Sequence, residues 1–355
     1  MSKPAFEDAA DENAEPVIDL ADGYAELEPA FTTPPDLFAT LARTPQPRLQ
    51  QRFLEAYAEV AQEPLAAADV LFAPSASQAI SAVARLLVRE GARTIAVPEP
   101  AFDSLPGLLR HAGLEPVPVP ESDEALLAAV TRVDAVYLVL PNNPTGWAPA
   151  DETLARLADL ARAHGRTVVI DRTSRFHQDR QFSAVFGYDF DWIDLLDTGK
   201  TWSAAGAKVA FVRARSGERL SALREDLDVH FHGVAPVHYW AATEAIRGEQ
   251  GLARLRATVA ANREQLVAAL GPLGFELVSQ PMGVALLRLP ADCAMDSAHL
   301  AEKLAIAGIR VIPGREFYWS APEAGSVYLR VALARPVPLF RASVEALAEA
   351  VGSLI

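Results

Sequence analysis

The feature that most constrains the fold is a regular alternation of short apolar runs and amphipathic runs between about residues 70 and 215. The runs AVYLVLP (135–141) and TVVID (167–171) are rich in valine and have the length of buried strands. Between them, DETLARLADLARAHG (151–165) has an aspartate cap, a glycine stop and the spacing of an amphipathic helix. Alternation of this kind is typical of a mostly parallel sheet covered by helices on both faces. The sequence therefore predicts an α/β fold in which ligands bind at the carboxyl ends of the strands.

The pattern changes past residue 215, where two long helical stretches (217–229 and 239–269) precede several short strands and two further helices. This order predicts a smaller α+β domain, and 355 residues suit a large and a small domain in one chain. Residues 26–47 carry five prolines and are expected to be extended. We expect four segments: a flexible tail (1–16), an N-terminal arm (17–47), a large domain (48–240) and a small C-terminal domain (241–355).

The composition argues against several classes of binding partner, namely nucleic acids, membranes and metal ions. A net charge of −14 argues against binding to nucleic acid or to an anionic membrane surface, both of which require a basic face. No apolar run approaches a membrane span and the acidic start lacks a signal-peptide pattern, so a cytoplasmic protein is expected. A single cysteine, Cys293, and histidines without ligand spacing make a disulfide framework and a metal site unexpected.

Polar residues follow several of the apolar runs. These residues are Asn143 in PNNPTG (141–146), then Asp171, and then Asp197, Thr198 and Lys200. Because the carboxyl ends of parallel strands meet at one edge of a sheet, we expect these side chains to share a pocket.

Two further features lie at the same predicted edge. A helix expected at 75–91 opens with the small residues Ser75, Ala76 and Ser77, whose backbone N–H groups are free to bind a phosphate. Phe102 follows the strand TIAVP (94–98) and could stack on an aromatic ring.

A cofactor with a phosphate, a basic ring nitrogen, a phenolic oxygen and an aldehyde would use all of these groups, and pyridoxal 5'-phosphate (PLP) has all four. Lys200 would form a Schiff base with the aldehyde. Asp171 would keep the ring nitrogen protonated, and Asn143 would donate a hydrogen bond to the phenolate. Arg330, in VYLRVALA, would pair bidentately with a substrate carboxylate.

Each of these residues also has a structural explanation. Most lysines are solvated, aspartates at strand ends often form turns, NNPTG is strong turn chemistry, and phenylalanines mostly lie in cores. Ser75 and Ser77 could serve only as a helix cap. Arg330 is harder to explain in this way, because an arginine between Leu329 and Val331 in a strand needs a partner. Lys200 and the residues around it favour the functional interpretation as a set.

The order NNPTG, ID, GK and YLRVALA resembles that of the fold-type I, class I/II aminotransferases, over about residues 17–353. The resemblance implies a PLP-dependent transferase fold of type I, a seven-stranded-type sheet in the large domain, and a homodimer with active sites between subunits. DLADG (19–23) is similar to the family's N-terminal strand, which implies that Gly23 lines the substrate pocket.

Three positions depart from the family pattern. Lys208 replaces a phosphate-binding arginine, Asp197 replaces a serine or threonine that binds the phosphate, and Ser174 replaces a tyrosine that contacts the phenolate. A lysine lacks the bidentate fork of arginine, and an aspartate would repel a phosphate.

The same departures are similar to a narrower group that contains the PLP-dependent L-arginine oxidases and hydroxylases of enduracididine-type biosynthesis. In that group the aspartate of DTGK holds the substrate guanidinium, which implies a substrate contact for Asp197. The group has a histidine, required for its oxygen-dependent outcome, where this chain has Tyr24. Tyr24 is therefore expected in the substrate pocket, and its identity favours transamination.

We expect transamination between an L-amino acid and a 2-oxo acid in specialised, natural-product metabolism, with Lys200 removing the Cα proton. One alternative is an oxygen-consuming oxidase or hydroxylase of L-arginine or a related basic amino acid. The other is a non-catalytic PLP-binding sensor, for which the acidic net charge is unfavourable if DNA is the output.

Overall fold

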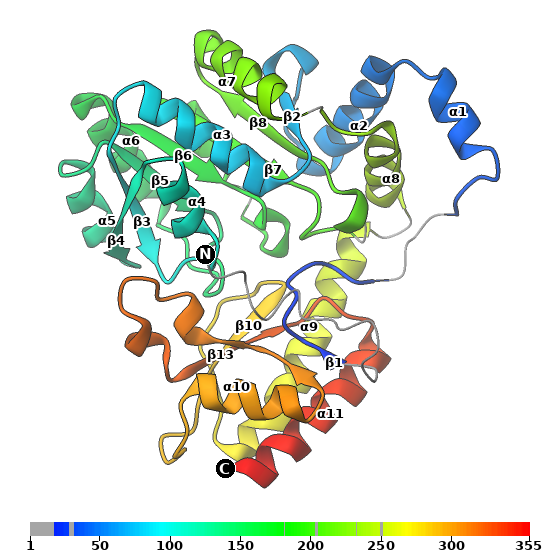
Figure 1. Ribbon diagram of the computed structural model, residues 1–355, viewed down its shortest axis with the longest axis vertical. Coiled ribbons are helices and arrows are strands. Elements are labelled where there is room, and N and C mark those ends of the chain that lie inside the picture. Colours follow the sequence, from blue (N-terminus) through cyan, green and yellow to red (C-terminus); the bar gives the residue numbers. More distant parts are fainter. Residues whose placement is uncertain (1–17, 28–31, 181, 203–204, 232, 249–250) are drawn as a thin grey trace.

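The computed structural model describes residues 18–27, 32–180, 182–202, 205–231, 233–248 and 251–355. The expected tail, residues 1–16, lies outside them. Figure 1 shows a large part built on one wide sheet and a smaller part below it, with helix α9 (Gly251–Leu270) extending from the junction into the smaller part. Among the described residues, no helix is both long and apolar enough to span a lipid bilayer.

One sheet of seven strands organises the large part. Its order is β2 (Leu71–Ala73), β8 (Ala210–Ala214), β7 (Asp191–Asp197), β6 (Thr167–Asp171), β5 (Ala135–Val139), β3 (Thr94–Glu99) and β4 (Glu115–Pro120). Neighbours from β7 to β4 are parallel, whereas β8 runs antiparallel to β7 and β2. Every residue of β5 and β6 is buried, as valine-rich strands covered on both faces should be. The prediction of a mostly parallel seven-stranded sheet is confirmed.

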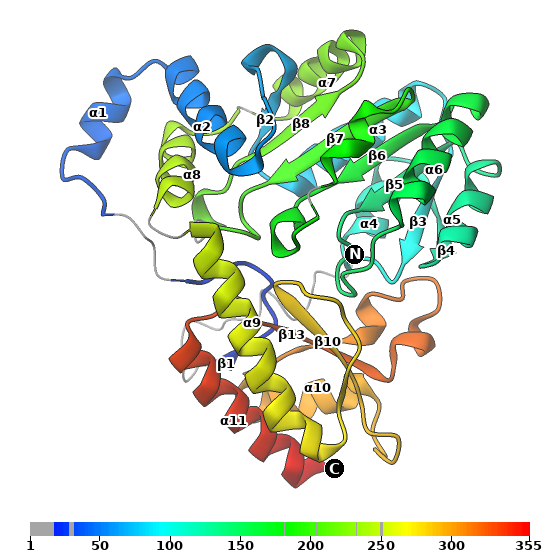
Figure 2. The same ribbon diagram turned by 180° about the vertical axis from the view of Figure 1, so that it is seen from behind.

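Helices cover both faces of this sheet, as the two opposite views show (Figure 1, Figure 2). On one face, α3 (Ala76–Arg89), α4 (Leu105–His111) and α7 (Gly217–His230) share an apolar cluster with the strands. On the other face, α5 (Asp123–Val130) and α6 (Asp151–His164) form a second cluster. A third cluster joins α2 (Gln46–Ala61) and α8 (Pro236–Arg247) to the β8 edge.

The smaller part is an antiparallel sheet packed against helices. The strand order is β12 (Ile312–Pro313), β13 (Tyr328–Ala332), β10 (Val284–Arg288) and β9 (Glu276–Leu277), and the helices are α9, α10 (Ser297–Ile306) and α11 (Val337–Leu354). The first described strand, β1 (Ile18–Asp19), pairs in parallel with β11 (Ile309–Arg310). The start of the described chain therefore belongs structurally to the C-terminal α+β unit.

Two expectations are wrong in detail. The stretch 239–269 is not one helix, because α8 ends at Arg247, before Gly248, and α9 begins at Gly251. The extended conformation expected within 26–47 does not hold for Leu37–Arg43, which form α1. Two of the five prolines lie at the start of α2. Pro45 is its N-cap residue, and Pro47 lies in its first turn, where a missing backbone N–H costs no helical hydrogen bond.

Candidate active site

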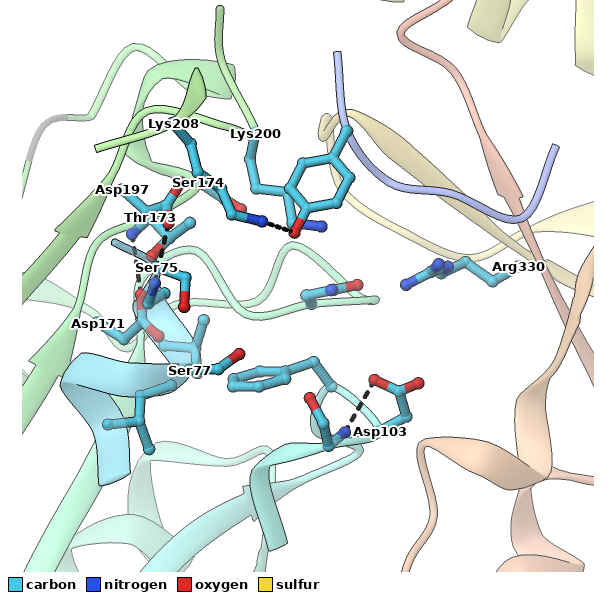
Figure 3. Close-up of a pocket in the computed structure, with 17 residues that line it drawn as sticks. Ser75, Ser77, Asp103, Asp171, Thr173, Ser174, Asp197, Lys200, Lys208 and Arg330 are labelled. Atoms are coloured by element: carbon cyan, nitrogen blue, oxygen red, sulfur yellow. Dashed lines mark hydrogen bonds between the residues drawn. The ribbon is translucent and has the colours of Figure 1, made fainter. Parts of the chain in front are cut away.

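A pocket lies at the carboxyl ends of β5, β6 and β7, and Arg330 of β13 lines its opposite side (Figure 3). Its lining residues are Tyr24, Ser75, Ala76, Ser77, Ile80, Phe102, Asp103, Ser104, Val139, Asn143, Asp171, Thr173, Ser174, Asp197, Lys200, Lys208 and Arg330. The structure thus brings together all the predicted site residues except Gly23 and Thr198.

Those two residues lie next to the pocket. Gly23 lines a small adjoining cavity that it shares with Asn143, Ser174 and Lys200. Thr198 is fully buried, and its hydroxyl accepts the backbone N–H of Val209 at 2.9 Å. Thr198, which we expected to share the pocket and contact the cofactor, is not among the residues that line the pocket, and its side chain holds the segment that leads into β8.

Lys200 follows β7 on a turn where Gly199 relieves close packing. A Cβ at Gly199 would lie 3.0 Å from Asp197 Oδ1 and 3.0 Å from Tyr24 Cε1, closer than most side-chain contacts. The amine of Lys200 lies 3.7 Å from the centroid of the Tyr24 ring, and the carbonyl oxygen of Lys200 is 3.0 Å from His177 Nε2. The turn therefore presents the Lys200 amine to the pocket beside an aromatic face.

Asp171 ends β6 at the floor of the pocket and is 3% exposed. Its carboxylate accepts the Tyr137 hydroxyl at 2.9 Å and the Thr173 backbone N–H at 2.9 Å. Burial raises the pKa of Asp171, and the negative charge of Asp197 acts in the same direction. Because its hydrogen-bond donors are neutral, this carboxylate gains most from a cationic ligand.

The backbone N–H groups at the N-terminus of α3 are not all free, although the sequence predicts that they are. The backbone N–H of Ala76, expected to bind a phosphate, donates to Asp197 Oδ2 at 3.0 Å, and Gly199 N–H donates to Asp197 Oδ1 at 2.6 Å. Ser75 Oγ accepts the Gln78 N–H at 3.4 Å, so Ser75 is the N-cap of α3. One predicted phosphate donor is therefore already bound to a carboxylate.

Lys208 and Tyr24 are also linked at this end of the pocket. The ammonium of Lys208 donates to the Tyr24 hydroxyl and lies 4.3 Å from the centroid of the Tyr24 ring. The Tyr24 ring thus contacts both Lys200 and Lys208, which the sequence alone did not indicate.

Arg330 lies at the opposite side of the pocket from Asp197 and Lys208 (Figure 3). It is 3% exposed, it donates to the Ala21 carbonyl at 2.6 Å, and its guanidinium carbon lies 5.0 Å from the centroid of the Phe317 ring. A Cβ at Gly23 would be 3.6 Å from Lys200 Nζ and 3.9 Å from Arg330 Nη2. Gly23 therefore borders the space between the amine and the guanidinium.

Residues 24–337 match the family model of aminotransferase class I and II. The chain belongs to this family. It is 28% identical to the LL-diaminopimelate aminotransferase of Desulforudis audaxviator (strain MP104C), over 73% of this chain and 68% of that protein. It is 31% identical to the aromatic amino acid aminotransferase of Thermobifida fusca (strain YX), over 66% of this chain and 67% of that protein.

A solved structure of MppP, soaked with the product 2-ketoarginine, is similar to this aminotransferase throughout. The TM-score is 0.82 at 26% sequence identity, and the match covers 93% of this chain and 98% of that one. The predicted fold-type I architecture and the PLP dependence of the aminotransferase are thereby confirmed.

The residues of the aminotransferase pocket fit PLP. Among the residues that the structure describes, the buried carboxylate of Asp171 has no cationic hydrogen-bond donor, and a protonated ring nitrogen would supply one. The buried amide oxygen of Asn143 has no hydrogen-bond partner within the described parts of the chain, as is typical of a group that faces a ligand. Lys200 and Lys208 line the same space.

Sequence reasoning missed several residues of this site. Tyr137 lies within an apolar strand, where an aromatic residue is usually core, so nothing marked its bond to Asp171. Thr173 was detectable as the second residue after a strand-ending aspartate, since aspartates often bond such backbone N–H groups. Asp103 and Ser104 directly follow Phe102, but side chains that line a cleft from a loop carry no periodic signal.

Proposed function

We propose that this pocket transfers the amino group of an L-amino acid to a 2-oxo acid, with Lys200 as its catalytic amine. The observation that carries the proposal is the shared space of three groups: the Lys200 amine, the Asp171 carboxylate and the Arg330 guanidinium. When bound, PLP supplies an aldehyde that accepts the amino group and a ring that draws electrons from the substrate α-carbon.

The side chains of the pocket would hold the cofactor, move the proton and bind the substrate. Lys200 would hold the aldehyde carbon until the substrate amine replaces it, and would then move the proton from the substrate α-carbon. Asp171, held by Tyr137, would keep a positive charge at the ring nitrogen. Asn143, together with Ser174, would contact the phenolic oxygen, and Arg330 would bind the substrate carboxylate and so orient the α-hydrogen.

The remaining cofactor contacts are assigned in the same way. Phe102 would stack on the ring, and Ser75, Ser77 and Lys208 would contact the phosphate. We propose that residues 48–240 and 241–355 act as two domains around this site. Gly23 and Tyr24 of the N-terminal arm would complete its substrate side, as their place beside Lys200 supports.

Further parts of the proposal follow from the family. We propose a homodimer in the cytoplasm, and a role in specialised amino-acid metabolism. The expected substrate contact of Asp197 is less well supported, because its carboxylate faces α3 and lies across the pocket from Arg330 (Figure 3).

One observation favours a second candidate, an oxygen-consuming oxidase or hydroxylase of a basic amino acid. It is the similarity to the structure of MppP with 2-ketoarginine, at a TM-score of 0.82. Tyr24, in place of the histidine of the oxidase group, disfavours it.

A single experiment separates these functions. Purified protein loaded with PLP is mixed with candidate L-amino acids without oxygen, and the cofactor spectrum is followed. Formation of pyridoxamine phosphate, with the matching 2-oxo acid, supports transamination. A long-lived coloured species that decays only in air, with oxygen consumed, supports the oxidase instead. No spectral change with any amino acid favours a non-catalytic sensor.

A further inference from the structure

Most of the backbone N–H groups in the first turn of α3 already have an acceptor within the protein. Ala76 N–H is bonded to Asp197, Gln78 N–H to the Ser75 hydroxyl, and Ala79 N–H to the Ser75 carbonyl. Within the described residues, this leaves the N–H of Ser77 as the first-turn donor without a recorded acceptor. A helix N-terminus binds phosphate through these N–H groups, so each one already occupied weakens the site.

The occupant of this helix end is itself an acid. Asp197 is 6% exposed and its two oxygens accept N–H groups at 3.0 Å and 2.6 Å, so the carboxylate is held in place. A phosphate monoester carries a charge of about −1.5 to −2 near neutral pH. Two anions at one helix end repel each other, and low exposure to water increases the repulsion.

The available cations are partly engaged elsewhere. Lys208 donates its ammonium to the Tyr24 hydroxyl, and the Lys200 amine faces the Tyr24 ring and is the group proposed to bind the aldehyde. Among the described residues, neither lysine forms an ion pair with Asp197 within 4.0 Å, although both lie near enough to favour its ionised form.

We propose that Asp197 competes with the phosphate of PLP for the N-terminus of α3 and so sets how tightly the protein holds its cofactor. The inference rests on the proposed function, because it requires PLP to be bound at Lys200 with its phosphate toward α3. Retention of the cofactor then depends mainly on the bond to Lys200 and on contacts with the ring, and only weakly on the phosphate.

Pyridoxal, which lacks the phosphate, isolates this effect. Protein freed of cofactor is titrated with PLP and with pyridoxal, and the absorption band of the Lys200 adduct gives both dissociation constants. D197S removes the charge and restores a hydroxyl, and D197N removes the charge while keeping the shape of the side chain. We expect D197S to bind PLP about tenfold to a hundredfold more tightly, while its affinity for pyridoxal stays within about twofold.

The outcomes are distinguishable. Unchanged or weaker PLP binding in D197S, at unchanged pyridoxal affinity, would overturn the inference alone. If neither compound gives the Lys200 band in the wild-type protein, the proposed function fails and this inference fails with it. Equal gains for PLP and pyridoxal in D197S also contradict the inference, since such a change does not act through the phosphate.

A pH titration tests the wild-type protein without relying on a variant. Burial raises the pKa of Asp197, while the nearby Lys208 and Lys200 oppose that rise. Asp171 and Tyr24 are further titratable groups near it. At low pH the protonated acid does not repel the phosphate, so the preference for PLP over pyridoxal should be largest there. It should fall as the pH rises through the pKa of Asp197, and D197N should lack this fall. A wild-type preference that follows the same pH curve as D197N contradicts the proposal.

Discussion

Two buried carboxylates in this aminotransferase end neighbouring strands of one sheet, yet they have opposite surroundings. Asp171 at the end of β6 accepts hydrogen bonds from Tyr137 and Thr173, both neutral. Asp197 at the end of β7 accepts two backbone N–H groups, one of them at a helix N-terminus, and has Lys200 and Lys208 nearby. Burial raises the pKa of both.

The difference shows what each carboxylate is suited to bind. Asp171 accepts hydrogen bonds only from neutral groups in the described part of the chain, so a positively charged group placed beside it is strongly stabilised. Asp197 already lies in the region of positive potential at the N-terminus of α3. Its negative charge weakens the attraction between this region and an incoming anion. Position at a strand end puts both acids in the pocket, but their partners decide their chemistry.

The largest effect is expected at Lys200, whose amine lines the same pocket as these two acids. K200A should abolish the absorption band of bound cofactor and lower amino-group transfer at least about a thousandfold, since both the covalent link and the proton transfer are lost. Spectra and single-turnover rates measure this. K303A, at an exposed position of α10, is the matched control and should leave both unchanged. A normal band in K200A contradicts the assignment.

The two carboxylates can be compared directly. D171N should slow exchange of the substrate α-proton with deuterated water by about a hundredfold or more, because the charge at the ring nitrogen is no longer held. D197N should change that rate by less than about tenfold, because its carboxylate faces α3. Nuclear magnetic resonance of the substrate gives both rates. Similar losses in the two variants would remove the distinction drawn above.

An effect of intermediate size is expected at Arg330, on the substrate side of the pocket. R330K keeps a charge but loses the bidentate fork, so we expect KM for the amino acid to rise about tenfold to a hundredfold, with a smaller change in kcat. R288K, on the adjacent strand β10 and exposed, serves as the control. A change confined to kcat would show that Arg330 acts on the reacting atoms and not on the carboxylate.

The smallest effect is expected at the link between Tyr24 and Lys208. Y24F removes the hydroxyl that accepts the Lys208 ammonium, and the freed charge becomes available to a phosphate. PLP affinity should rise about twofold to tenfold, the usual value of one hydrogen bond. The same titration with PLP and pyridoxal measures it. Weaker PLP binding in Y24F would mean that the phenol itself holds the phosphate.

Most of the fold was predictable because its signals are local. Valine-rich runs marked β5 and β6, and a capping serine and a glycine stop marked the ends of helices such as α3 and α6. The break between α8 and α9 was missed although Gly248 and Gly251 flank it, because an isolated glycine is tolerated within a helix and does not by itself mark a helix end.

The sequence predicted which residues lie in the site, but it did not predict their hydrogen-bond partners. Strand ends brought Asn143, Asp171 and Lys200 together, as expected. The bond from Tyr137 to Asp171 joins adjacent strands, and that of Asp197 to Ala76 joins residues far apart in the chain. Such partners depend on strand order and register, which one sequence does not display.

The pairing of the first described strand with the C-terminal α+β part has a consequence for synthesis on the ribosome. Leu20 accepts the N–H of Ala332, and Arg335 donates to the carbonyl groups of Asp19, Asp22 and Tyr24. At about 5–20 residues per second, the N-terminal segment emerges on the order of tens of seconds before these partners. During that interval its backbone has no partner from the C-terminal sheet, so a nascent chain stalled before residue 328 would expose a segment to which chaperones could bind.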